Sequence, residues 1–347
     1  MEKIKLSIIV PCYKVEKYLP RCLDSLMNQA LDGVETICIN DGSPDRCIEI
    51  LRNYQKKYAD KLVIIDKENE GVWKGRRDGI KAAKGEYIGF VDSDDYVALD
   101  YAEKLYNKAK EEGADISVCG FDRVELTTGK LYSREMCKSS DKIIEVEKDQ
   151  GGLLEMNGAP WNKIYRADLL KKMPDLQNPP PILDDMMFLL LIFLNSKKIV
   201  FVNESLVYYQ VRRDSIINTI KENQLKETYD AMLEVKKIYM ESETGRKMLE
   251  MLDAMAFLHF GVSLMFRLSY DKSCNLKRAI EHNNMWLDKN FPTWRNNEYI
   301  SIQYVISNQF VNFKLWIVKS FYKVHLFRLF LGMYRFMIDK IGLDIKW

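Results

Sequence analysis

Residues 85–96 read Gly-Glu-Tyr-Ile-Gly-Phe-Val-Asp-Ser-Asp-Asp-Tyr, and the rest of the chain is best understood outward from them. Residues 87–91 are aromatic or β-branched apart from one glycine, which is typical of a strand buried on both faces of a parallel sheet. Three carboxylates follow within four residues, at Asp92, Asp94 and Asp95. Open α/β sheets bind ligands at the carboxyl ends of their strands. The stretch therefore predicts a ligand site at one edge of a parallel sheet.

The residues alone allow two interpretations of this acidic cluster. Neighbouring carboxylates repel one another unless a cation or hydrogen-bond donors compensate them. Mg²⁺ and Mn²⁺ prefer oxygen ligands and often share them with phosphates, so the cluster indicates a metal–diphosphate site. In the other interpretation, the segment is a loop in which Asp94 or Asp95 caps the following helix.

The flanking segments alternate regularly between two hydrophobic periods. We expect strands at 6–10, 34–40, 62–66 and 87–91, separated by helices at 15–30, 44–58 and 74–83 and followed by a helix at 100–112 and a strand at 116–121. This order predicts an α/β fold with a doubly wound, mostly parallel sheet and helices on both of its faces.

The pattern is less regular after residue 121. Residues 122–150 predict either an insertion or a β-hairpin, and residues 184–194 predict a buried helix. Residues 201–202 and 206–211 predict two short antiparallel strands. Helical periodicity then predominates, so we expect a domain boundary near residue 215, with an α/β domain over 1–215 and a helical C-terminal region over 216–347.

Composition narrows the function classes. The net charge of +2 gives no overall case for nucleic-acid binding. Seven scattered cysteines without a CxxC pair suggest a reduced, cytoplasmic setting. No secretory signal is recognisable at the N-terminus. The longest strongly apolar run, residues 186–194, is far shorter than the about 20 residues that span a bilayer.

Polar residues also follow the first two expected strands. Pro11-Cys12-Tyr13 could flank a base, and the carboxylate of Asp41 could accept from a base or a ribose hydroxyl. No GxGxxG or GxxxxGK[ST] motif is present, which argues against a dinucleotide cofactor and a P-loop. Arg76 and Arg77 could answer phosphate charge or be solvated helix charges.

Taken in order, these motifs resemble the family 2 glycosyltransferases with a GT-A fold. The matching stretches are Ser7-Ile-Ile-Val-Pro-Cys-Tyr13, Asn40-Asp-Gly-Ser43, Asn69-Glu-Gly-Val72, Gly85 to Asp95, Trp161-Asn-Lys-Ile-Tyr-Arg166 and Asp184-Asp-Met-Met-Phe188. The resemblance covers about residues 4–216.

The resemblance implies a set of donor-binding residues. They are Pro11, Tyr13 and Asp41 around the uridine, Arg76 near the donor, Asp92 toward the ribose or the metal, and Ser93 and Asp95 in the same motif, with Asp95 facing the donor sugar. Asp92 and Asp94 would form the DxD pair, with Asp94 as the direct ligand of Mn²⁺ or Mg²⁺. Asp185 would be the general base.

The sequence departs from the family pattern in three places. Gly75-Arg76-Arg77 replaces Ala-Arg-Asn, and the acidic pair is Asp184-Asp185 rather than Glu-Asp, which leaves open which carboxylate acts. Arginines rather than a histidine follow Tyr209, so Arg213 is a candidate diphosphate contact. Trp161, Asp184 and Arg213 are candidates for contacting the acceptor or supporting the site; for Trp161, core packing is equally open.

Residues 310–338 mix aromatic residues with lysines and arginines and contain no acidic residue. The cations are Lys314, Lys319, Lys323, Arg328 and Arg335. Such a segment could lie on an anionic membrane surface, as a glycolipid acceptor would require. It could equally form a helical bundle that packs on the rest of the chain or on a second subunit of a homo-oligomer.

The resemblance implies an inverting transfer of a sugar from a UDP-sugar to a hydroxyl of a growing glycan. A capsular polysaccharide, an O-antigen or a lipooligosaccharide, lipid-linked at the inner face of the cell membrane, is the expected acceptor. The alternative is a non-catalytic nucleotide-sugar-binding scaffold subunit of GT-A fold. A nucleotidyltransferase is disfavoured, because no glycine-rich, lysine-containing phosphate loop follows the first strand.

Overall fold

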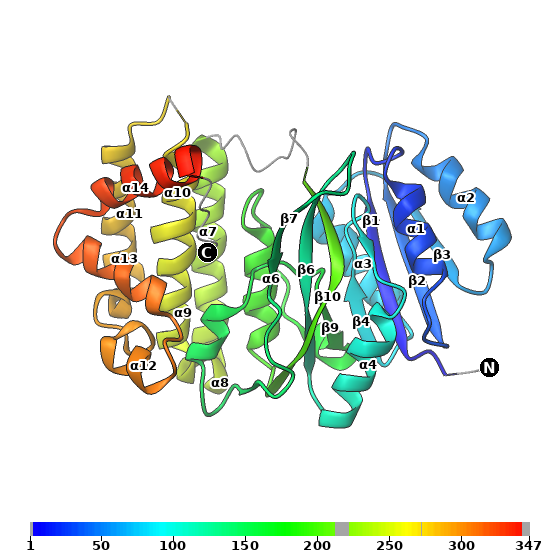
Figure 1. Ribbon diagram of the computed structural model, residues 1–347, viewed down its shortest axis with the longest axis horizontal. Helices are drawn as coiled ribbons and strands as arrows, with labels where there is room; N and C mark the ends of the chain where they lie inside the picture. The colour runs from blue at the N-terminus through cyan, green and yellow to red at the C-terminus, as the bar shows by residue number, and fades with distance from the viewer. Residues whose placement is uncertain (1–2, 212–221, 272, 342–347) are drawn as a thin grey trace. The chain divides into compact units, whose positions relative to one another are not determined.

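The computed structural model describes residues 3–211, 222–271 and 273–341 of the 347-residue chain (Figure 1). The chain divides into two compact units. The first comprises Met1–Val146, Gly158–Asp175 and Asp184–Ser215, and the second comprises Glu147–Asn157, Leu176–Leu183 and Ile216–Trp347. Two short segments from the first 215 residues thus belong to the second unit, which the sequence pattern did not indicate.

A ten-stranded sheet forms the centre of the first unit. Eight strands follow one another in the order β3-β2-β1-β4-β9-β6-β10-β5, while β7 pairs with β6 and β8 with β10. The strands are β1 (Leu6–Cys12), β2 (Val34–Asp41), β3 (Leu62–Lys67), β4 (Tyr87–Phe90), β5 (Tyr96–Val97), β6 (Ile116–Glu125), β7 (Leu131–Glu135), β8 (Ile143–Glu145), β9 (Lys163–Arg166) and β10 (Lys198–Val211).

The first four strands along the chain form a parallel half-sheet. Ile8 of β1 lies opposite Thr36 of β2 on one side and Gly89 of β4 on the other. Helices α1 (Leu19–Met27), α2 (Cys47–Lys57) and α3 (Val72–Ala82) connect these strands. The βαβ alternation and the mostly parallel α/β sheet predicted from the sequence are therefore confirmed.

The other half of the sheet is mixed. β9 runs antiparallel to both β4 and β6, whereas β6 and β10 are parallel. The prediction of two short strands at 201–202 and 206–211 was wrong, because β10 is one strand. Its exposed Asn203 and Glu204 resemble a turn in sequence but form a bulge where the register with β6 shifts. Of the two predictions for 122–150, the hairpin is correct, since β7 pairs antiparallel with β6.

Three further helices complete the first unit: α4 (Tyr101–Glu112), α5 (Ala167–Lys172) and α6 (Asp184–Phe193). Every residue of α6 after its two aspartates is buried, as expected for a helix with no polar face. Phe188 of α6 packs edge-to-face on Phe90 of β4 and on Trp73 of α3. This packing places the first turn of α6 close to the helix that carries Arg76.

The second unit is helical in the part that the structure describes, as the sequence predicts. Its elements are η1 (Gly151–Glu155), α7 (Glu222–Glu241), α8 (Glu243–Lys247), α9 (Leu249–Ala256), the π-helical η3 (Phe257–Leu264), α10 (Met265–Leu268), α11 (Leu276–Asn290), η4 (Pro292–Arg295), η5 (Glu298–Ile300), α12 (Ile302–Ser307), α13 (Phe313–Lys323), α14 (Phe327–Phe336) and η6 (Met337–Ile341). Among the described residues, one helix, Leu249–Leu268, is long and apolar enough to cross a membrane, but 72% of its most apolar window is buried inside the structure.

Candidate active site

The acidic turn, residues 92–95, follows the carboxyl end of β4. The Asp95 amide donates to the Asp92 carbonyl at 2.9 Å. One carboxylate oxygen from each of Asp92, Asp94 and Asp95 lies within 4.8 Å of the other two. The interpretation of Asp94 or Asp95 as a helix cap is wrong, because β5 comes next and α4 begins only at Tyr101.

β10 holds the acidic turn through a residue that the sequence analysis missed, Gln210. Its backbone N–H donates to Asp95 Oδ1 at 2.7 Å, and its side-chain amide donates to the Asp94 carbonyl. Arg21 of α1 donates to Gln210 Oε1 at 3.3 Å. Gln210 is buried, and so are Ser93 and Asp95 in the turn. Nothing local in the sequence marks Gln210, since its role depends on a partner 115 residues away.

Arg76 links the acidic turn to the second acidic pair, Asp184 and Asp185, at the start of α6. Its Nη1 lies 2.6 Å from Asp185 Oδ1 and 3.4 Å from Asp184 Oδ2, and its Nη2 lies 3.9 Å from Asp92 Oδ1. The Arg76 side chain is 3% exposed, whereas the three carboxylates are 23–36% exposed. The arrangement therefore covers the cation and leaves acidic oxygens within reach of a ligand.

The charges at this point do not balance. Burial by itself would favour a neutral Arg76, but the carboxylates of Asp185, Asp184 and Asp92 raise its pKa above the ordinary value. Burial raises the pKa of Asp92, and Arg76 opposes this rise only in part. Burial and the neighbouring Asp185 likewise raise the pKa of Asp184. Three carboxylates facing one guanidinium favour the binding of a further positive charge.

The donor set of the acidic turn fits Mg²⁺ or Mn²⁺. All three converging side chains offer carboxylate oxygens, the ligands that these hard cations prefer. Asp92 and Asp94 are only partly buried, so phosphate oxygens or water could complete the coordination. Asp95 is better placed to hold the turn, since its Oδ1 already accepts the Gln210 amide.

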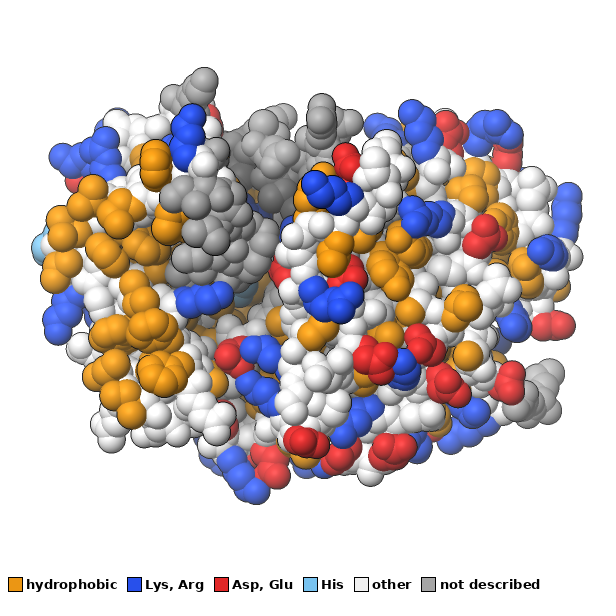
Figure 2. Space-filling view, in the orientation of Figure 1, with side chains coloured by type: hydrophobic (Ala, Val, Ile, Leu, Met, Phe, Trp, Pro, Cys, Tyr) orange, Lys and Arg blue, Asp and Glu red, His pale blue; other side chains and the backbone are white. Residues whose placement is uncertain are grey.

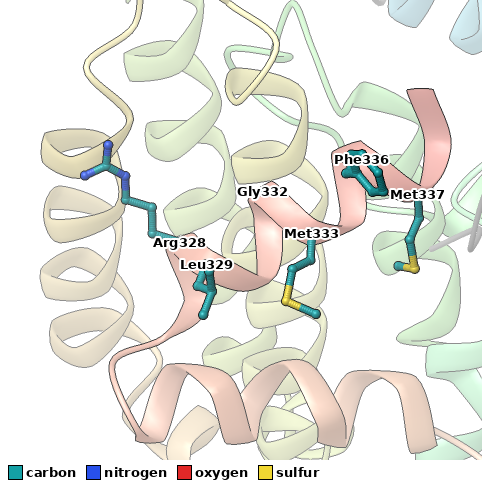
Figure 3. Close-up of a pocket in the computed structure, with 6 residues that line it drawn as sticks. All are labelled: Arg328, Leu329, Gly332, Met333, Phe336 and Met337. Atoms are coloured by element: carbon teal, nitrogen blue, oxygen red, sulfur yellow. The ribbon is translucent and has the colours of Figure 1, made fainter. Parts of the chain in front are cut away.

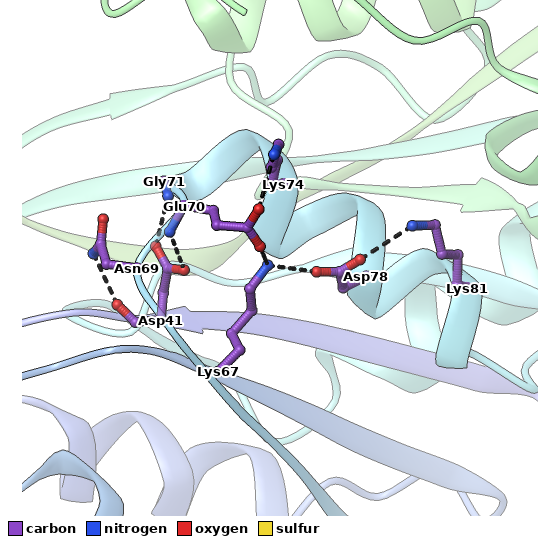
Figure 4. A network of polar contacts seen from close by, with 8 residues as sticks. All are labelled: Asp41, Lys67, Asn69, Glu70, Gly71, Lys74, Asp78 and Lys81. Carbon is purple, nitrogen blue, oxygen red and sulfur yellow. Dashed lines mark hydrogen bonds and ion pairs between the residues drawn. The ribbon is translucent and has the colours of Figure 1, made fainter.

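Asp41 ends β2 and holds the start of α3 (Figure 4). Its Oδ1 accepts from the Glu70 amide at 2.9 Å and its Oδ2 from the Gly71 amide at 2.8 Å. The side chain of Asn69 donates to the Asp41 carbonyl at 2.8 Å. In the same network, Lys67 pairs with Glu70 and with Asp78 of α3. Asp41 is thus rigidly placed at a strand end, on the edge of the sheet where Pro11 lies in the last residues of β1 and Tyr13 follows that strand.

The loops after β1 and β2 are tied together beside these residues. Ser43 Oγ accepts from the Lys14 amide at 2.8 Å, and Asp45 Oδ2 accepts from the Glu16 amide at 3.0 Å. In the opposite direction, Glu16 Oε2 of the first loop accepts from the Arg46 amide of the second at 3.0 Å. Tyr13 is 44% exposed on the first of these loops, so its ring is available to a ligand.

Arg76 and Arg77 are not solvated helix charges. The Arg77 side chain is 16% exposed, and its Nε lies 3.3 Å from Asp175 Oδ2. Trp73 donates to the other oxygen of Asp175 at 2.8 Å. α3 is therefore anchored on both sides of Arg76, and a Cβ at Gly79 would lie 2.5 Å from Ile9 of β1. Tight packing of this helix fixes where Arg76 lies.

The remaining candidates lie away from these contacts or outside the described residues. Trp161 is 6% exposed, packs edge-to-face on Phe121 and stacks on Tyr209, so its ring belongs to the hydrophobic core. Lys163, two residues later, was missed: it is fully buried, donates to the Ala159 carbonyl at 2.6 Å, and burial lowers its pKa to about 7. Arg213 lies outside the described residues.

Comparison with known proteins gives the family. A model of glycosyl transferase family 2 matches residues 7–173. Glycosyltransferase GlyG of Streptococcus pneumoniae is 30% identical over 223 residues, which cover 62% of this chain and 73% of GlyG. The chain belongs to glycosyl transferase family 2. The resemblance and the enzyme class inferred from the motifs are confirmed.

Other relatives in the family differ in length. Glycosyltransferase GlyA of Streptococcus pneumoniae is 31% identical over 239 residues, which cover 66% of this chain and 34% of GlyA. Putative glycosyltransferase EpsH of Bacillus subtilis is 29% identical over 272 residues, 76% of this chain and 78% of EpsH. The chain thus spans about a third of GlyA and over three quarters of EpsH.

Solved structures share the fold. Residues 1–349 of TarS from S. aureus match with a TM-score of 0.67 at 19% identity, over 99% of this chain and 93% of that one. The same protein in complex with UDP-GlcNAc matches with a TM-score of 0.61 at 21% identity, over 95% and 91% of the two chains. The GT-A fold expected from the motifs is confirmed.

Proposed function

We propose that this family 2 enzyme transfers a sugar, with inversion, from a UDP-sugar to a hydroxyl of a growing cell-surface glycan. The observation that carries the proposal is the link made by Arg76 between the acidic turn and the first turn of α6. It brings carboxylates suited to a metal–diphosphate and a carboxylate suited to a base to one point at the end of β4.

The names of relatives support the donor and the class of acceptor. Poly(ribitol-phosphate) beta-glucosyltransferase of Bacillus spizizenii is 34% identical over 216 residues, which cover 61% of this chain and 33% of that protein. TarS has been crystallised with UDP and with UDP-GlcNAc. The first name supports a polymer as the acceptor for this chain, and the TarS complexes support a UDP-hexose or UDP-N-acetylhexosamine as its donor.

In the proposed complex, Asp92 and Asp94 would hold Mn²⁺ or Mg²⁺, and the bound ion would offset the negative charge of the diphosphate leaving group. Pro11, Tyr13 and Asp41, at the ends of the two neighbouring strands, hold the uridine. Ser93 and Asp95 keep the acidic turn in shape from its buried side.

Asp185 accepts the proton of the acceptor hydroxyl as that hydroxyl attacks the anomeric carbon. Its side chain is 36% exposed, so an acceptor can reach it, and the 2.6 Å contact with Arg76 holds its orientation. Asp184 Oδ2 lies 3.4 Å from the same Arg76 nitrogen, so the two carboxylates share one guanidinium. The acceptor in this proposal is a glycan or glycolipid, and the transfer takes place on the cytoplasmic side of the cell membrane.

Release of UDP tests the reaction directly. UDP-Glc, UDP-Gal, UDP-GlcNAc and UDP-GalNAc are each incubated with the purified chain and Mn²⁺, with and without a chelator. We expect one donor to be hydrolysed slowly, with loss of activity in the chelator and in Asp94→Asn, but not in the control Asp60→Asn, an exposed carboxylate.

Two outcomes would contradict the proposal. Calorimetric binding of UDP without hydrolysis or transfer from any donor would favour the non-catalytic scaffold. Hydrolysis that survives both the chelator and Asp94→Asn would remove the role of the acidic turn.

A further inference from the structure

α14 is apolar on its outward side as well as on its inward side. The inward side chains, Phe327, Phe330, Leu331 and Tyr334, are buried within the second unit. On the other side Leu329, Met333 and Phe336 are 57%, 52% and 60% exposed. A helix at a protein surface normally carries polar residues there, so three large apolar side chains within two turns indicate a binding surface.

The exposed side chains form an open hollow (Figure 3). It is lined by Arg328, Leu329, Gly332, Met333, Phe336 and Met337, which we call the α14 face. Leu329, Met333 and Met337 project from one side of the helix. Apart from Gly332, its two chain neighbours and the adjoining helix backbone, no described atom lies within 4 Å of where a Cβ of Gly332 would be, so no other described residue covers this position.

The turn that precedes α14 is also apolar and exposed. Val324 and Leu326 are 58% and 47% exposed, on either side of His325, whose φ of 60° breaks the helix between α13 and α14. Apolar side chains gather widely over the helices of the second unit (Figure 2). The basic, aromatic segment 310–338 thus contains two separate helices, α13 and α14, each with its own outward side.

The charge of this region has one sign. Residues 310–338 contain five lysines and arginines and no acidic residue. Lys314, Lys323 and Arg328 are exposed, and the last two flank the exposed turn. Arg335, by contrast, is turned back to the Ser269 carbonyl and the Tyr270 ring.

We propose that the α14 face and its neighbouring cations bind the surface of an anionic membrane. Apolar side chains at the acyl boundary and cations at lipid phosphates are how interfacial helices bind. A second copy of the chain fits less well, because a two-fold interface sets a patch against itself and would oppose like charges. The cations also argue against a spanning helix. The inference does not depend on the proposed reaction.

Vesicle co-sedimentation tests this surface with the full chain. We expect binding to phosphatidylcholine vesicles that contain phosphatidylglycerol, at least tenfold weaker binding to phosphatidylcholine alone, and weakening by salt. Lys323→Gln with Arg328→Gln should weaken binding more than tenfold, because each cation near an anionic surface contributes about fivefold. Leu329→Gln with Met333→Gln should weaken it to a similar extent.

Matched pairs of control substitutions in the same unit distinguish binding at this surface from nonspecific adsorption to vesicles. Two control pairs alter exposed side chains elsewhere: Lys289→Gln with Arg278→Gln on α11, and Met240→Gln with Met285→Gln. Both should bind vesicles as the parent does. Absence of vesicle binding by the parent chain, or equal losses in the control pairs, would overturn the proposal. So would sedimentation velocity showing a dimer that Leu329→Gln with Met333→Gln abolishes, without vesicle binding.

Discussion

Arg76 is the residue on which the two acidic groups of the site depend. Its guanidinium contacts carboxylates that are 16, 108 and 109 positions away along the chain, all through the two terminal nitrogens. A buried cation of this kind stabilises the folded chain chiefly because its loss would leave unpaired carboxylates.

Arg76→Met should therefore lower the free energy of unfolding by about 2 kcal/mol. This is less than the roughly 3–5 kcal/mol typical of a fully buried pair, because the three carboxylates are 23–36% exposed and keep some water. Urea denaturation measures the loss. Arg52→Met, which removes an exposed pair with Asp66, is the control and should change stability by less than about 0.5 kcal/mol. Equal effects of the two variants would contradict the role of Arg76.

Asp185 can be tested without disturbing the fold. Asp185→Asn keeps the shape of the side chain and one oxygen for Arg76 but removes the carboxylate that we propose as the base. Turnover should fall by about 10²–10⁴-fold, while UDP binding measured by calorimetry stays nearly unchanged. Asp184→Asn is the comparison that identifies the acting carboxylate. A larger loss in Asp184→Asn than in Asp185→Asn would exchange the two roles.

At the scale of elements, the acidic turn depends on β10. Gln210→Met keeps the buried volume and the backbone bond to Asp95 but removes the bonds to the Asp94 carbonyl and from Arg21. Unsatisfied buried groups of this kind cost about 1–3 kcal/mol, which urea unfolding would measure. Gln55→Met, which loses one part-buried bond to the Leu62 carbonyl, is the control. A stability change no larger than that of the control would show that the side-chain hydrogen bonds of Gln210 do not stabilise the acidic turn.

The tie between the loops after β1 and β2 predicts a pH dependence. Although partial burial opposes it, hydrogen bonds from Cys47, Ser43 and Glu16 lower the pKa of Asp45 to about 2. The unfolded value is about 3.9, so the stabilisation is complete above pH 4 and is lost as the pH falls toward 2. Asp45→Asn should cost about 1–2 kcal/mol at pH 7, discounted for partial exposure, and progressively less below pH 4.

Urea unfolding of both chains at pH 7, 4 and 3 measures this difference. A constant difference across the three pH values would mean that the contribution of Asp45 does not come from its charge.

At the scale of the molecule, two segments of the first 215 residues belong to the second unit. Residues 147–157 carry η1, whose Leu153 and Leu154 are buried there. Asn312 donates to the Gly151 carbonyl at 3.0 Å, and Tyr304 donates to Asp149 at 2.5 Å. The helical unit thus includes residues 147–157, which the hydrophobic pattern assigns to the α/β domain over 1–215.

A chain that ends at residue 215 should therefore be poorly soluble. It lacks most of the second unit, to which the buried residues Leu153, Leu154, Met156 and Leu176 belong, and should therefore expose them. Size-exclusion chromatography and binding of a hydrophobic dye measure the exposure, and Leu153→Ser with Leu154→Ser in the truncated chain should reduce both aggregation and dye binding. A monodisperse truncated chain without dye binding would show that these segments pack within the first unit instead.

The sequence by itself determined the parallel half of the sheet, the acidic turn at its edge and the family. These follow from hydrophobic period, from residues at strand ends and from motifs in order, all of which act over a few neighbouring positions. Tertiary structure alone decided the pairing of Arg76 with Asp185, the hydrogen bonds of Gln210 to the acidic turn and the inclusion of residues 147–157 in the helical unit. The single strand β10 belongs with them, since its bulge exists only against β6. Each joins residues far apart in the chain, and packing at such separation leaves no local pattern in the amino acids that take part.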